Sequence, residues 1–123
     1  MVTNVLDLER ETIANEDFRR VIFTGHDLQL VLMTLTPGEQ LGRQTHGHHD
    51  QFIRVESGIG KVSLDDHDYP LTHGIAVVIP AGVEHNLINT SNTQPLRFYA
   101  LYGPPEHPDG TVHASKADAP SEH

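Results

Sequence analysis

The sequence predicts an all-β domain, and three observations support this fold class. From Arg19 to Tyr102, short β-prone runs alternate with turn residues, chiefly Gly, Pro, Asn and Asp. No helical period of apolar residues interrupts this stretch. Each run has the length of a typical strand, and roughly eight or nine of them in one domain favour a sandwich or a closed antiparallel barrel.

The predicted strands are separated by residues that favour turns. In order, the runs are 20–24, 28–36, 43–48, 52–56, 60–64, 69–71, 75–79, 85–89 and 96–101. Pro37-Gly38 and Ser57-Gly58 are typical breaks, and the acidic segment 65–68 predicts a tight hairpin rather than a calcium loop. The chain of 123 residues lies within the usual size range of one domain, so we expect all these runs to belong to a single domain.

Two flanking segments complete the predicted organisation. We expect residues 1–18 to form an N-terminal extension, 19–103 the barrel and 104–123 an extended C-terminal tail. A weak amphipathic pattern predicts a helix within 6–18. Three prolines between positions 104 and 108 favour an extended path at the start of the tail.

Composition excludes several classes of function. Eight basic and seventeen acidic residues give a formal charge of -9, which repels nucleic-acid backbones and anionic lipid surfaces. The chain has no cysteine, which excludes thiolate zinc sites, iron–sulfur clusters and thiol catalysis. Neither a membrane span nor a signal pattern is apparent, so we expect a cytoplasmic protein.

One segment places a histidine at the start of a returning strand. Gly74 precedes an apolar run, the turn Pro80-Ala-Gly82 reverses the chain, and His85 opens the next run, which ends at Asn89. A side chain at that point faces the mouth of a barrel. His85 is therefore the first candidate for a functional residue.

A second segment carries further polar candidates. Gln44 and His46 are two residues apart, as are His46 and His48, and residues at that spacing share one face of a strand. Gln51 follows shortly after, and Gly58 ends the segment. These side chains can project together into the barrel.

The two segments resemble the two motifs of the cupin family. The segment around His85 matches the second cupin motif at every specified position, whereas the earlier segment has Gln44 and Gln51 in place of a His and the Glu. The whole is similar to small one-domain cupins often labelled as related to mannose-6-phosphate isomerase, with a shared Pro-Pro-Glu-His ending. The resemblance implies a cupin jelly-roll β-barrel, and small cupins commonly form homodimers.

The resemblance also implies a metal site. Cupins with both complete motifs hold a divalent ion such as Zn, Mn, Ni or Fe with three His and one Glu. Carried over by position, the candidate ligands are Gln44, His46, Gln51 and His85. Amide oxygens are poor ligands for a dication, and His48 or His49 can supply a third imidazole if the chain bulges after His46. The sequence leaves open which of the two takes that place.

Three functions follow as alternatives. The first is a metal-dependent isomerase, lyase or dioxygenase that acts on a small polar substrate, with His85 as the candidate catalytic residue. The second is a metal-free module that binds a sugar-like ligand through hydrogen bonds, which the amide of Gln51 favours. The third is a structural homodimer that pairs through outward apolar residues such as Phe52 and Ile88.

The remaining polar residues have simpler interpretations. His26, His67 and His73 fall in predicted turns, where exposure to solvent is the simplest expectation. His107 and His113 lie in the tail, for which solvent exposure is favoured over folding back across the mouth. A phosphosugar substrate needs a cation, and the barrel candidates are Arg43, Arg54, Lys61 and Arg97.

Overall fold

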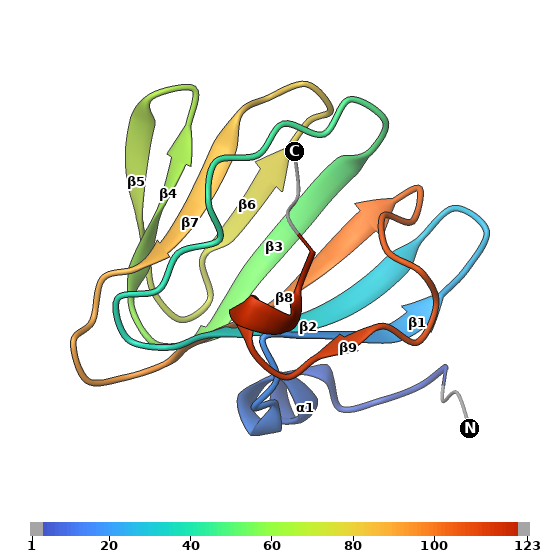
Figure 1. The fold of residues 1–123 in the computed structure, drawn as a ribbon, viewed down its shortest axis with the longest axis horizontal. Helices are drawn as coiled ribbons and strands as arrows, with labels where there is room; N and C mark the ends of the chain where they lie inside the picture. The colour runs from blue at the N-terminus through green and yellow to red at the C-terminus, as the bar shows by residue number, and fades with distance from the viewer. Residues whose placement is uncertain (1–3, 121–123) are drawn as a thin grey trace.

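The computed structural model describes residues 4–120, which form two antiparallel sheets that face each other (Figure 1). The larger sheet has the strand order β6-β3-β8-β2-β1-β9, and the smaller has the order β5-β4-β7. The predicted jelly-roll barrel is confirmed, with strands from distant parts of the chain side by side in both sheets. Residues 1–3 and 121–123, at the outer ends of the predicted flanking segments, lie outside the described residues.

The elements follow one another in this order: α1 (Leu8–Ala14), β1 (Arg19–Thr24), β2 (Gln29–Leu35), β3 (Asp50–Ser57), β4 (Gly60–Leu64), β5 (His67–Leu71), β6 (Ala76–Ile79), β7 (His85–Asn89), β8 (Leu96–Gly103), β9 (Val112–His113) and the short 3-10 helix η1 (Lys116–Asp118).

One predicted strand is wrong. The run 43–48 forms no strand, because the long β2–β3 connection crosses to the edge of the smaller sheet and pairs with β7 through isolated bridges rather than a continuous ladder. Gln44 and His85 exchange two backbone hydrogen bonds, each of 2.9 Å. Gly42, with φ of +97°, turns the chain just before this contact. The connection therefore runs along the mouth of the barrel rather than through a sheet.

Apolar side chains form two layers. Alternate residues of β3, such as Ile53 and Val55, point inward and join the core between the sheets, which includes Phe98. On the outer face, Phe52 packs with Leu32 and Tyr99 in a second cluster, to which Leu8 of α1 also belongs. Because Phe52 is part of this cluster, it is not the freely exposed interface residue that the sequence suggested.

The helix and the predicted hairpin have clear local causes. α1 is shorter than the predicted range 6–18; the carboxylate of Asp7 caps it by accepting a hydrogen bond of 3.2 Å from the backbone N–H of Arg10. Asp65 and Asp66 have positive φ angles of 45° and 70° between the paired ends of β4 and β5. The tight hairpin predicted at 65–68 is confirmed.

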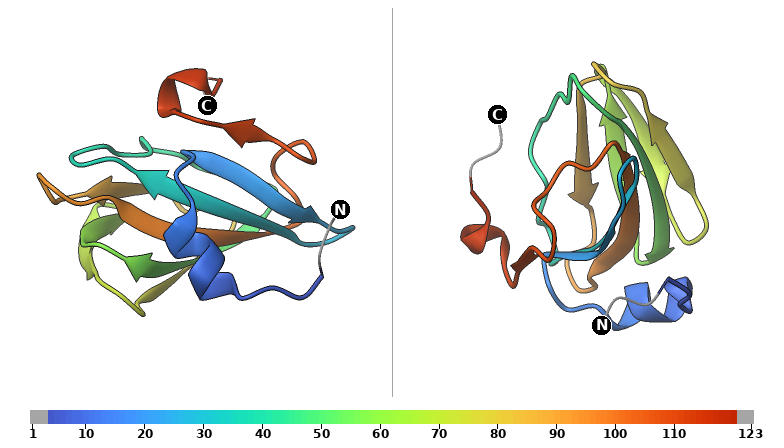
Figure 2. Two further views of the ribbon diagram at one scale, coloured as in Figure 1. Left: turned by 90° about the horizontal axis from the view of Figure 1, so that it is seen from below. Right: turned by 90° about the vertical axis from the view of Figure 1, so that its right-hand side faces the viewer.

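The C-terminal segment folds back onto the larger sheet instead of only extending away from it. After the proline-rich stretch, β9 pairs with β1, so that Arg19 lies opposite His113. Figure 2 shows this segment on one side of the sandwich and α1 on another. No helix within residues 4–120 is long and apolar enough to cross a membrane.

Candidate functional site at the barrel mouth

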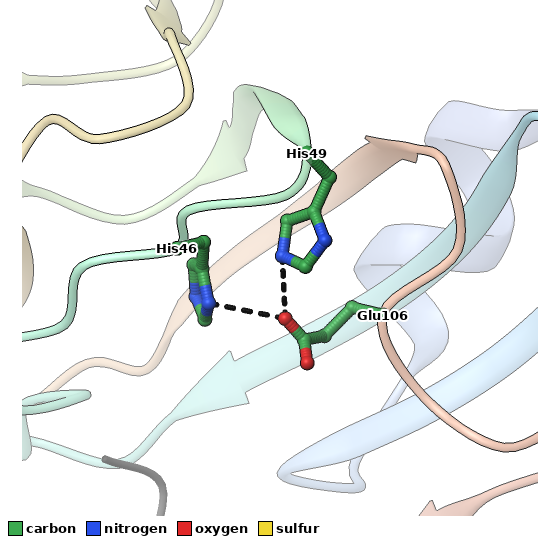
Figure 3. Close-up of side chains that lie close together, drawn as sticks. All are labelled: His46, His49 and Glu106. Atoms are coloured by element: carbon green, nitrogen blue, oxygen red, sulfur yellow. Dashed lines mark ion pairs between the residues drawn. The ribbon is translucent and has the colours of Figure 1, made fainter.

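Two histidines and one carboxylate meet where the β2–β3 connection approaches the C-terminal segment (Figure 3). A carboxylate oxygen of Glu106 lies 3.0 Å from Nδ1 of His46 and 2.5 Å from Nε2 of His49. His46 and His49 precede β3, whereas Glu106 follows β8, so the fold joins residues far apart in the sequence. The ligand atoms of all three lie within 4.8 Å of one another.

His85 lies beside this cluster in a form suited to coordinating a metal. Its ring centroid is 5.4 Å from that of His46. Nδ1 lies 3.0 Å from the carbonyl oxygen of Val83, so a proton on Nδ1 donates to that carbonyl. Nε2 then carries a lone pair, and this atom is buried without a hydrogen-bond partner. Burial lowers the pKa of His85, which favours the neutral ring.

The turn before β7 fixes both histidines in place. Gly82, with φ of +89°, reverses the chain in the Pro-x-Gly turn predicted from the sequence. Its backbone N–H donates a hydrogen bond of 2.8 Å to the carbonyl of His46. The same turn thus sets the start of β7 at His85 and holds the loop that carries His46.

Gln51 and Tyr102 line the site from the larger sheet. Both are buried, on neighbouring strands, and they stand opposite each other in the register of β3 and β8. The Gln51 amide donates a hydrogen bond of 3.1 Å to the Tyr102 hydroxyl, which leaves Oε1 of Gln51 buried without a partner. The Tyr102 ring meets those of His46 and His49 edge-on.

The other predicted ligands occupy different positions. Gln44 approaches His46, with 3.2 Å between its Oε1 and Nε2 of the ring. His48 is exposed and does not join the cluster, whereas His49 is buried within it. Of the two histidines that the sequence could not separate, the structure brings His49 to the site, and the chain bends at residues 47–48 between His46 and His49.

Three residues near the mouth were not predicted from the sequence. Glu106 and His107 belong to the segment expected to be solvated, yet both are partly or largely enclosed. Burial first, and then the charges of Arg19, His46, His113 and His49, lower the pKa of His107 to about 3. Arg19 is itself buried, 3.3 Å from His113. The shared Pro-Pro-Glu-His ending was the one sequence signal for these positions.

A second group of similar composition lies on the outer face. His73, in the β5–β6 connection, has Nε2 at 3.4 Å from a carboxylate oxygen of Glu9 and 3.9 Å from one of Glu56. Arg54 binds the other oxygen of Glu56 at 2.9 Å. His73 is exposed, as the sequence predicts.

The donor set at the mouth fits a divalent cation. The ligand atoms of His46, His49 and Glu106 lie within 4.8 Å of one another, and the ring of His85 lies 5.4 Å from that of His46. Nε2 of His85 and Oε1 of Gln51 are both buried without a hydrogen-bond partner. Buried acceptors without partners are costly unless a ligand or ion satisfies them. Imidazole with carboxylate suits zinc, nickel, iron and manganese.

The comparisons with known proteins agree on the fold. The chain is 45% identical over 121 residues to the uncharacterized protein YrkC of Bacillus subtilis, covering 94% of this chain and 64% of YrkC. It therefore spans less than two thirds of that relative. BH2720 from Bacillus halodurans is a solved structure with 43% identity and a TM-score of 0.90, covering 93% of this chain and 90% of that one.

A more distant structure shows the same fold alone. The RmlC-like cupin from Shewanella frigidimarina has 21% identity and a TM-score of 0.66, and the match covers 72% of this chain and 77% of that one. The model of the cupin domain family matches residues 31–102, which run from within β2 to within β8 and include the loop that carries His46 and His49. The chain therefore belongs to the cupin domain family.

Proposed function

We propose that this cupin binds one divalent metal ion at the barrel mouth and acts on a small polar substrate. The imidazoles of His46, His49 and His85 are the proposed ligands. The observation that carries the proposal is the buried, unpartnered Nε2 of His85, whose ring is held by the carbonyl of Val83. A hydrogen bond from the other ring nitrogen to a backbone carbonyl fixes the tautomer of metal-binding histidines.

The two glutamines predicted as ligands receive different proposed roles. Oε1 of Gln51 has no partner and can bind the ion weakly or accept a hydrogen bond from a substrate hydroxyl. Gln44 orients the ring of His46 through its amide. His49 takes the place that the sequence also offered to His48, because His48 is exposed.

When bound, such an ion acts as a Lewis acid on a hydroxy-carbonyl or enol-like oxygen, which is compatible with isomerase, lyase or dioxygenase chemistry. The protein supplies the rest. Tyr102 and Gln51 form a polar wall opposite the histidines, where their hydrogen bond fixes both groups. The buried floor beneath them, which includes Ile53 and Ala100, excludes water from that side.

A metal-free binding module is the second candidate, and Gln51 is the observation in its favour. An amide carries no charge to offset the desolvation of a cation, whereas it serves a neutral ligand well. With its donor occupied by Tyr102, Gln51 presents a free acceptor, and Nε2 of His85 presents another. In this alternative, His85 is also the candidate for proton transfer without metal.

Elemental analysis of untagged protein separates the two candidates. We expect near one ion per chain, lost in a His46→Ala/His85→Ala double variant and kept in His26→Ala, whose side chain is 96% exposed. Absence of any ion after soaking with zinc, manganese, nickel and iron would reject the metal site and favour the binding module. Light scattering on the same samples tests the homodimer that the cupin resemblance implies.

A further inference from the structure

We propose that the C-terminal segment completes the metal site: Glu106 supplies the anionic ligand that the barrel lacks at Gln51, and Gln29 is the residue that positions it. This inference rests on the proposed metal site. It places the negatively charged ligand in the segment after β8 rather than on β3. Glu106, in the segment after β8, contacts His46 and His49 of the β2–β3 connection (Figure 3), and its backbone binds Gln29 of β2.

The need for a carboxylate follows from charge. Three neutral imidazoles and the Gln51 amide leave a divalent ion with its full charge in a partly buried site. Desolvation of such a charge is expensive unless an anion lies beside it. Among the described residues that could hold an ion with His46 and His49, the carboxylate is that of Glu106.

Glu106 is already directed at the proposed ligands. One of its oxygens contacts both His46 and His49, and its side chain is 25% exposed, so the carboxylate is shielded from much of the solvent. Both contacts are ion-pair contacts, and the buried Oε2 of Glu106 and Nε2 of His49 have no hydrogen-bond partner, so these atoms are available to hold an ion.

Gln29 holds the backbone that carries this carboxylate. It is fully buried on β2, and all the hydrogen-bonding capacity of its amide is used. Oε1 accepts from the backbone N–H of Glu106 at 3.0 Å and of His107 at 2.9 Å. Nε2 donates to the carbonyl of His107 at 2.7 Å and to the hydroxyl of Thr24 at 3.0 Å. The amide therefore binds two consecutive residues as a strand neighbour would.

The remainder of the tail is attached independently. Thr111 accepts a hydrogen bond of 2.8 Å from the backbone N–H of Val21, and β9 continues this contact along β1. Loss of the Gln29 amide should therefore release the residues around Glu106 without detaching the whole tail. This makes the role of Gln29 separable from overall folding.

Titration with Co2+, followed by visible absorption, tests the inference. We expect Gln29→Leu to weaken binding by about tenfold, within the range of about 10–100-fold seen when residues that support metal ligands are replaced, and Glu106→Gln, which removes the proposed ligand itself, to weaken it by about 100-fold. Gln29→Glu keeps the two acceptor contacts and should recover part of the loss. Asp109→Asn, which removes an exposed charge from the same segment, is the matched control and should bind as the wild type does.

Hydrogen exchange on metal-free protein gives a second measurement. In Gln29→Leu, the backbone amides of Glu106 and His107 should exchange faster, whereas those of β9 and the barrel keep their protection. The inference is overturned if the wild type binds Co2+ and Glu106→Gln binds it within about twofold, or if Gln29→Leu leaves both affinity and exchange unchanged. A wild type that binds no ion instead overturns the proposed function and this inference with it.

Discussion

Two groups of histidine and carboxylate differ in their surroundings more than in their composition. At the mouth, the side chains of His46, His49 and Glu106 are 16%, 8% and 25% exposed. On the outer face, the side chains of His73 and Glu9 are 62% and 55% exposed, although that of Glu56 is 1% exposed. Water therefore reaches two of the three members of the outer group.

Their neighbours differ as well. The mouth adds a third imidazole and two buried acceptors without partners, from His85 and Gln51. The outer group adds Arg54, which binds one oxygen of Glu56 and supplies the positive charge there. The comparison teaches that enclosure and neighbouring charge, rather than residue type, decide which group suits a metal ion.

The largest expected effect is on metal content. A His46→Ala/His49→Ala variant should lose the bound ion, whereas His73→Ala/Glu9→Gln should keep it, because only the first pair belongs to the enclosed donor set. Elemental analysis of both proteins measures the difference. Equal loss of metal from the two variants would remove the distinction between the groups.

Acid should destabilise the folded protein, because buried histidines near the barrel mouth resist protonation. The pKa of His107 is about 3 in the folded protein, whereas a histidine free of such interactions has a pKa of 6.5. As pH falls, this imidazole therefore takes up a proton in the unfolded chain before it does so in the folded protein. This contribution to the free energy of unfolding is fully present above pH 6.5 and is lost as pH falls toward 3. Burial lowers the pKa of His85 as well, which adds in the same direction.

Urea unfolding between pH 7.5 and 4 measures this dependence. His107→Phe removes the titrating ring but keeps the backbone that Gln29 binds, so its stability should fall less steeply with acid. His26→Phe, at a fully exposed turn on the surface, should follow the wild type. Identical slopes for wild type and His107→Phe would contradict the assignment.

On the outer face, Glu56 should matter more than its partners. Glu56→Ala leaves Arg54 without its partner beside a buried position and should cost about 1–3 kcal/mol. Chemical denaturation measures this change. Adding Arg54→Leu should recover part of the loss, because both charges are then removed together. A double variant that loses more free energy of unfolding than the two single variants together would argue against this pairing.

The smallest effect is expected at Glu9. Its contact with His73 is an exposed ion pair, and such pairs contribute about 0–1 kcal/mol. Glu9→Gln should shift the urea midpoint by little, and the midpoint of this variant should change little with added salt. A large loss of stability would show that this contact holds α1 on the sheet.

Much of the fold was predictable because its signals are local. The Pro-x-Gly turn fixed the position of His85, and Asp65 and Asp66 form the predicted hairpin. The prediction that 43–48 is a strand was wrong because its partner is the edge of a different sheet, which only the fold brings near. A period of two residues therefore misled us about His48, which points outward in a loop.

The candidate site was predictable only in part. The rings of His46 and His85 lie 5.4 Å apart, and the predicted Pro-x-Gly turn places His85 at the start of β7. Gln51 is buried on β3, whereas His46 lies in a loop, where the predicted strand alternation does not apply. Glu106 and His107 were assigned to a solvated tail on composition. Nothing local predicts that Gln29, on β2, binds their backbone.

The sequence by itself determined the all-β class, the turns and the place of His85 directly after the Pro-x-Gly turn, since these depend on neighbours along the chain. The tertiary structure alone decided that His49 enters the site, that His48 does not, and that Glu106 reaches both histidines from the far end of the chain. The physical reason is that burial and ion pairing depend on which distant segments pack together, and that packing has no signature in local sequence.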